Sequence, residues 1–120
     1  MDKQQALHSF WSRFGTAYDA YTVPDNAPFP RITYECSISD WGDTVFLTGS
    51  VWDRSTSWKS VTDVCNQISE YIGLGGCTIP YDGGMMWITK GSPFAIRLSE
   101  EDDSVRRIVF NINVEFISAD

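Results

Sequence analysis

The chain has 120 residues, of which 42% are hydrophobic and 21% charged, and this length and composition predict one globular domain spanning residues 1–120. Its formal net charge of −7 and the scattered positions of its nine basic residues exclude the clustered Lys and Arg footprint of a nucleic-acid-binding surface. The sequence has no run of ~18 apolar residues and no signal-peptide pattern, so an intracellular protein without a membrane span is expected.

The first predicted element is a helix over residues 2–14. Its large apolar side chains recur at helical spacing and fall on one face: Leu7, Phe10, Trp11 and Phe14. Asp2 is expected to cap this helix, with Gln5 completing a capping box. Gly15 is expected to end it.

Residues 16–30 predict an irregular connection, because three prolines prevent a continuing helix. Apolar and polar side chains alternate over 31–39 and again over 45–52, which is typical of two strands. The short turn at 40–43 favours an antiparallel hairpin.

A second helix is predicted to begin near Ser57, with Ser57 or Ser60 as its N-cap. Its apolar stripe consists of Val61, Val64, Cys65, Ile68 and Ile72. Gly73 is expected to end the helix, followed by a hydrophobic contact from Leu74.

The C-terminal third reads as further strands, at 77–81, 85–89, 94–98 and 107–116, with a polar loop at 99–104. The order of helix, hairpin, helix and strands predicts an α+β fold. It consists of a mostly antiparallel sheet of about four to six strands with two helices packed on one face.

Candidate catalytic and metal-binding groups are sparse. His8 is the only histidine, and the acidic run at 100–103 lacks the spacing of a calcium loop. The glycines at 73–76 follow a helix, whereas phosphate-binding glycines precede one. Glu35 and Glu115 are expected to be two solvated acids. These patterns predict neither an enzyme nor a metal or cofactor site.

The cysteines are odd in number and widely spaced, at Cys36, Cys65 and Cys77. The sequence has no C-x-x-C motif. These features predict small core thiols in a reducing compartment rather than disulfides or a metal centre.

The chain has five tryptophans, and they predict where it meets other proteins. Trp41, Trp52 and Trp87 are predicted at subunit contacts, since large exposed aromatic side chains are costly unless a partner covers them. Arg54 follows Trp52 in the polar junction before the second helix and is assigned to the same contact, as a neighbour of Asp53 in a turn. Trp11 and Trp58 are expected to pack within the fold.

Several segments, in order along the chain, resemble the tail terminator (tail-completion) proteins of siphophages and prophages of Gram-positive bacteria. They are Thr22-Val-Pro-Asp25, 29–35, the junction from Val51-Trp52 to Trp58, Gly91-Ser-Pro-Phe94 and 106–116. The similarity covers nearly the whole chain and includes its length.

The resemblance implies an α+β subunit of a homo-oligomeric ring, usually hexameric, without catalytic residues. Such a ring caps the head-proximal end of the tail tube, ends polymerisation of the tube protein and joins it to the head–tail connector protein. DNA passes through the ring without specific binding. The protein would reside in the virion tail, and in the bacterial host cytoplasm during assembly.

Three alternatives remain open from the residues. One is another neck or head-completion component of a phage. A second is a small-ligand or carbohydrate-binding module that uses Trp52, Trp58 or Trp87. A third is an enzyme in which Glu35 or Glu115 lines a closed pocket.

Overall fold

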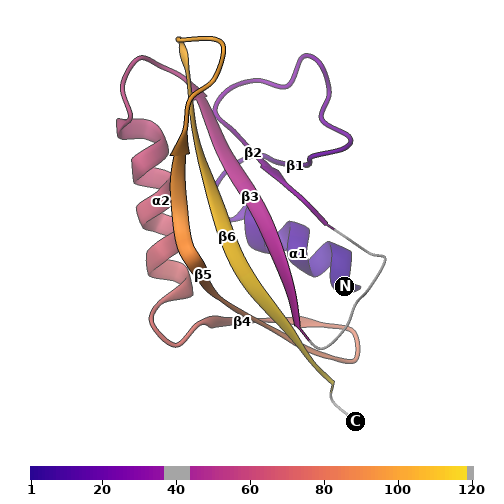
Figure 1. The fold of residues 1–120 in the computed structure, drawn as a ribbon. Helices are drawn as coiled ribbons and strands as arrows, with labels where there is room; N and C mark the ends of the chain where they lie inside the picture. The colour runs from indigo at the N-terminus through magenta and orange to yellow at the C-terminus, as the bar shows by residue number, and fades with distance from the viewer. Residues whose placement is uncertain (37–43, 119–120) are drawn as a thin grey trace.

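The computed structural model describes residues 1–36 and 44–118. It shows an α+β fold in which one curled sheet carries both helices on the same face (Figure 1). The fold class predicted from the sequence is therefore confirmed. The predicted turn at 40–43, with Trp41, lies outside the described residues.

The helices are α1 (Lys3–Ser12) and α2 (Lys59–Ile72). The strands are β1 (Ala17–Asp19), β2 (Arg31–Tyr34), β3 (Thr44–Arg54), β4 (Cys77–Tyr81), β5 (Gly84–Leu98) and β6 (Val105–Ser118). The strand order is β1-β2-β3-β6-β5-β4, and all neighbours are antiparallel except β1 and β2. The long strand β6 lies at the centre.

Helix α1 begins as predicted. The Asp2 carboxylate accepts the Gln5 amide at 2.8 Å, and the Gln5 side chain accepts the Asp2 amide at 2.9 Å, which completes a capping box. The expected end at Gly15 is wrong. The helix ends at Ser12, because the Arg13 amide bonds to the Phe10 carbonyl and tightens the last turn.

Helix α2 differs from the prediction at its start and in the contact expected after its end. Trp58 is its N-cap, without a side-chain hydrogen bond, while the Ser57 hydroxyl accepts the Lys59 amide just outside the helix. Gly73 ends the helix in a left-handed conformation, as expected. Leu74, however, is fully exposed rather than packed, because the chain turns away from the core after Gly73.

The sheet contains features that the sequence pattern does not indicate. Strand β1 lies within the predicted connection, and β5 is one strand where two runs were predicted, with an irregular register between Lys90 and Ala95. Asp53 and Arg54 belong to the end of β3 rather than to a turn.

The core lies between the helices and one face of the sheet. Trp11 of α1 is fully buried and reaches the backbone of β3 at Gly49, where a Cβ atom would lie 2.6 Å from the indole ring. Only glycine leaves room for this ring. Ile68 and Ile72 of α2 fill the neighbouring part of the same layer.

Gly49→Ala should therefore lower the free energy of unfolding by about 1–3 kcal/mol, because the added methyl overpacks the Trp11 site. Gly75→Ala is the matched control, since a Cβ atom there meets nothing within 4 Å, and it should change stability by less than about 0.5 kcal/mol. Urea unfolding measures both. Equal stability of the two variants would contradict this account of the core.

Candidate assembly surface

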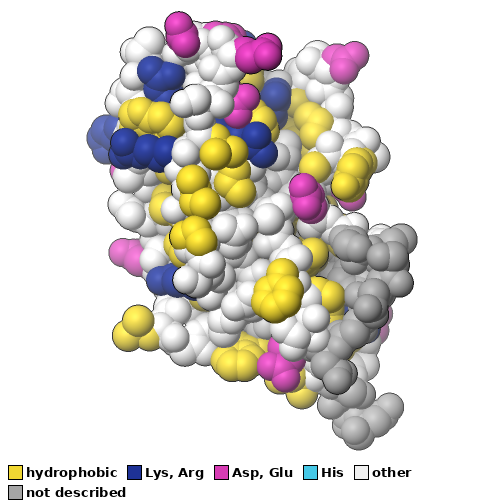
Figure 2. Space-filling view, viewed as in Figure 1, with side chains coloured by type: hydrophobic (Ala, Val, Ile, Leu, Met, Phe, Trp, Pro, Cys, Tyr) yellow, Lys and Arg dark blue, Asp and Glu magenta, His cyan; other side chains and the backbone are white. Residues whose placement is uncertain are grey.

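The face of the sheet opposite the helices carries no covering layer among the described residues, and we call it the open face. Side chains alternate in direction along β3 and β6. Every second side chain points toward the helices and joins the core, and the side chains between them lie on the open face. Hydrophobic side chains gather on it (Figure 2). Its exposed large apolar residues are Phe46, Met85, Trp87, Ile96, Leu98 and Ile117.

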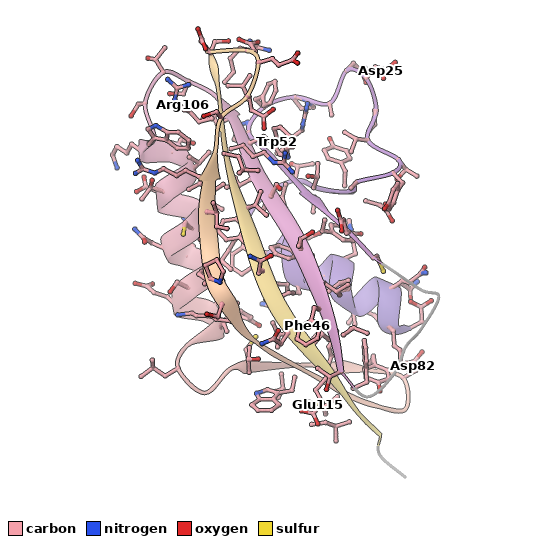
Figure 3. The ribbon with its side chains drawn as sticks, viewed as in Figure 1. Asp25, Phe46, Trp52, Asp82, Arg106 and Glu115 are labelled. Carbon is pink, nitrogen blue, oxygen red and sulfur yellow. The ribbon has the colours of Figure 1, made fainter. Side chains whose placement is uncertain are left out.

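We call the end at which residues 99–104 join β5 to β6 the hairpin end of the sheet. Figure 3 places Trp52 toward this end, and Phe46 and Glu115 toward the other. Phe46 is the most exposed of the apolar side chains on the open face, at 79%. A hollow of about 510 Å³ lies beside it, lined in part by Thr48 and Asn111. An exposed ring next to a hollow is a shape that a partner surface can fill.

Trp52 lies on the open face, as predicted, and is held in a fixed pose. Its indole N–H donates to the Thr33 hydroxyl at 2.9 Å. The Arg107 guanidinium lies 4.1 Å from the centroid of the Trp52 ring and also donates to the Ser50 hydroxyl. Because Arg107 covers one ring face, little of the aromatic surface is free to stack on a sugar.

Arg54 also lies on the open face at the hairpin end. It donates to Asp102 at 3.1 Å and to Ser104 at 2.7 Å, and it stands 5.1 Å from the ring of Phe29. Hydrogen bonds from Ser104, and then from Arg54, lower the pKa of Asp102 to about 2. The pair is exposed to water, so its net contribution to stability is small, and its main effect is to orient the hairpin loop.

Trp87 is the third described residue, after Trp52 and Arg54, that the sequence predicted at a subunit contact. It lies on the open face and is 37% exposed. Its indole N–H donates to the Gly75 carbonyl at 3.0 Å, and its ring nitrogen fills the place where a side chain on Gly76 would stand. The tryptophan therefore fixes the glycine loop that follows α2 and still presents a ring edge to solvent.

The arginines are less scattered than their positions in the sequence indicate. Strand register brings five of the six to the hairpin end: Arg31, Arg54, Arg97, Arg106 and Arg107. Carboxylates of the 99–104 loop neutralise two of them, because Arg54 pairs with Asp102 and Arg107 pairs with Glu100 at 3.4 Å. Acidic and basic groups are therefore interleaved here.

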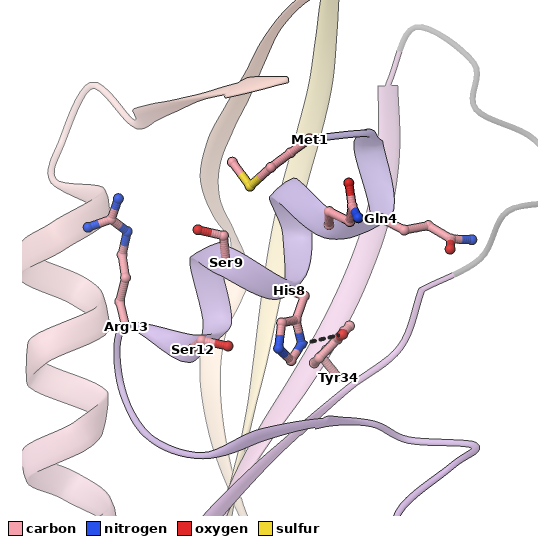
Figure 4. Close-up of a pocket in the computed structure, with 8 residues that line it drawn as sticks. Met1, Gln4, His8, Ser9, Ser12, Arg13 and Tyr34 are labelled. Atoms are coloured by element: carbon pink, nitrogen blue, oxygen red, sulfur yellow. Dashed lines mark hydrogen bonds between the residues drawn. The ribbon is translucent and has the colours of Figure 1, made fainter. Parts of the chain in front are cut away.

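A hollow of about 980 Å³ lies beside α1 (Figure 4). His8 Nδ1 and the Tyr34 hydroxyl lie 2.8 Å apart at its wall. Burial, and secondarily the charge of Asp19, raise the pKa of Tyr34, so its hydroxyl stays protonated. Ser9 and Ser12 also line this hollow, but the hydrogen bond of His8 is to the Tyr34 phenol, whereas a triad histidine is bonded to a serine and a carboxylate.

The remaining candidate chemical groups are the cysteine thiols and the acidic side chains. Burial raises the pKa of the thiols of Cys36, Cys65 and Cys77, which favours the protonated form over the nucleophilic thiolate. Across residues 1–36 and 44–118, no group of three or more His, Cys, Asp or Glu side chains is placed to hold a metal ion. Neither α1 nor α2 is long and apolar enough to cross a membrane.

Sequence reasoning missed Phe46, the most exposed apolar residue of the open face. The contact residues predicted from the sequence are three tryptophans and Arg54, although Phe46 occupies the same alternate positions of its strand as Trp52. Every second residue of β3 faces outward, and Phe46 is the large apolar residue at one of these positions. Counting along the strand from Trp52 would therefore have identified it.

Among the comparisons with known proteins, the one with solved structures shows a shared fold. No protein-family model matches the sequence, and no curated protein matches it by sequence. Among solved structures, the chain is similar to one in the "Virion of native gene transfer agent (GTA) particle", with a TM-score of 0.61 and 14% sequence identity. The match covers 96% of this chain and 94% of that chain, so it includes the sheet and both helices.

The hydrogen bonds around Asp102 predict a measurable titration. Ser104→Ala should raise the pKa of Asp102 from about 2 toward its ordinary 3.8, since the hydroxyl and its bond to the carboxylate are lost. Because the folded pKa is lowered, the ionised form stabilises the fold fully above pH 3.8, and this contribution is lost as the pH falls through about 2.

Carboxyl NMR titration of Asp102 tests this prediction. Ser99→Ala, in the same loop, is the control and should leave the titration unchanged. An unaltered Asp102 midpoint in Ser104→Ala would show that the serine does not hold the carboxylate.

Proposed function

We propose that the protein is a non-enzymatic structural component of a phage or phage-like particle and acts as its tail terminator. In this role a ring of copies caps the head-proximal end of the tail tube, stops its polymerisation and joins it to the head–tail connector. The observation that carries the proposal is the fold shared with a virion chain of a gene transfer agent over nearly the full length of both chains. The sequence resemblance to tail terminators, which does not rest on this fold comparison, supports the same role.

The open face supports an assembly role. A sheet face with several partly exposed large apolar side chains is typical of a surface that a partner covers. Trp52, Arg54 and Trp87 share this face with Phe46. Their indole and guanidinium groups are fixed by hydrogen bonds within the subunit. Because these side chains are already held in place, they lose little conformational entropy when a partner covers them.

The charge of the chain supports passage of DNA through the ring. At a net charge of −7, the protein repels the phosphate backbone at long range, and the arginines at the hairpin end are interleaved with carboxylates. A lumen formed by such subunits would allow the genome to slide without being held.

Phe46→Asp should abolish association with the tube or with neighbouring copies, because it places a charge at the most exposed point of the apolar open face. Folding should be retained, since the side chain is 79% exposed. Leu74→Asp, a fully exposed apolar residue outside the open face, is the matched control and should assemble normally. Sedimentation velocity and circular dichroism measure assembly and folding, and equal assembly of both variants would remove the open face from the interface.

The terminator role itself is tested on tubes polymerised from the tail tube protein of the same phage or phage-like particle. Negative-stain microscopy should show the protein at one tube end only, and its addition during polymerisation should shorten the tubes. If it binds the connector and leaves tube length unchanged, the protein is another neck component. If it binds neither, the proposal fails.

A further inference from the structure

A second surface, distinct from the open face, lies beside the start of α2. Two guanidinium groups flank one indole there: Arg97 stands 4.7 Å and Arg106 5.4 Å from the ring of Trp58. Neither arginine makes an ion pair with any residue in the described part of the chain. Arg106 is instead positioned by the carbonyls of Asp103 and Thr56. We call this cluster the Arg–Trp site.

An oppositely charged element lies across the sheet at the same end. Residues 20–26 form a loop at the start of the 20–30 connection between β1 and β2, and this loop carries Tyr21, which is 82% exposed, and Asp25. Asp25 is exposed and forms neither an ion pair nor a hydrogen bond within the described residues. Figure 3 places Asp25 and Arg106 on opposite sides of the hairpin end.

The loop is held in a defined shape by Asp19. The Asp19 carboxylate accepts the Tyr21 amide at 2.9 Å, and its carbonyl accepts the Thr22 amide at 3.0 Å. Tyr21 therefore projects from a fixed turn into solvent. An exposed tyrosine beside an unpaired carboxylate complements a site made of two unpaired guanidinium groups and an indole.

We propose that the 20–26 loop of one copy docks onto the Arg–Trp site of the next copy in the ring. Asp25 pairs with Arg97, and Tyr21 packs against the cluster. The inference rests on the proposed ring and names its subunit contact. The two surfaces differ and lie at the same end on opposite sides, so the contact is head-to-tail, and such a contact closes a ring when the rotation between neighbouring copies divides a full turn evenly. Arg97 is exposed and makes no hydrogen bond within the described residues, so its N–H groups are free for a carboxylate, whereas those of Arg106 donate to backbone carbonyls. Arg and Tyr are enriched at interfaces.

The Arg–Trp site could instead hold the phosphate groups of DNA. The composition of its surroundings favours the loop. The acidic 100–103 segment lies close to Arg106 along the chain, and the whole subunit has a net charge of −7. This negative charge repels a polyanion such as DNA much more strongly than it repels one short loop.

Charge reversal tests the contact directly. Asp25→Arg and Arg97→Asp should each weaken self-association about tenfold or more, and the double variant, in which every interface carries the reversed pair, should recover most of it. Tyr21→Ala should also weaken association without affecting folding, because the side chain is exposed. Glu70→Arg, the same charge change as Asp25→Arg on the exposed side of α2, is the control and should associate as the wild type does.

Sedimentation equilibrium of the free protein, and ring occupancy on tail tubes, give the two readouts. Rings that form equally well with Asp25→Arg, Arg97→Asp and Tyr21→Ala would overturn this contact and leave the terminator role standing. A protein that forms no oligomer, free or on tubes, would overturn both. Binding of duplex DNA that is lost in Arg97→Asp, with assembly unchanged in Asp25→Arg, would assign the site to phosphate and also overturn the contact.

Discussion

The alternation of side chains along β3 and β6 is the constraint on which the rest of the molecule depends. Because these central strands pair over their whole shared length, each residue is committed to one face of the sheet. One face receives Trp11 and the apolar stripe of α2 and becomes the core. The other face keeps Phe46, Trp52 and Trp87 without a covering layer in the described subunit, and this asymmetry makes the fold suited to assembly.

Local signals in the sequence predicted much of this fold. The capping box of Asp2 and Gln5, the stripe of α2 and the alternation of β6 depend on residues a few positions apart, and the structure contains all three. Features that depend on distant parts of the chain were missed. Strand β1 has three residues and exists only because β2 offers it a parallel edge.

The features of the candidate surfaces also fall into those that the local sequence predicts and those that depend on the pairing of distant strands. The side of the sheet on which Trp52 lies followed from counting along one strand. The Arg107 guanidinium over its ring did not, because that contact depends on the register between β3 and β6. Likewise, the arginines look scattered along the sequence and become neighbours only when the strands pair. The Arg–Trp site joins residues from β5, β6 and the start of α2, so no window of the sequence contains it.

The exposed surfaces described above are consistent with a subunit of an assembled particle. Apolar residues on the open face, the Arg–Trp site and the proposed contact with the 20–26 loop all fit a subunit that acts by binding other subunits. Native mass spectrometry of the protein released from tail-tube ends tests this account most directly. The account predicts a single closed oligomer, with six copies as the resemblance to tail terminators implies. Release of monomers only, at concentrations where the tubes remain capped, would contradict it.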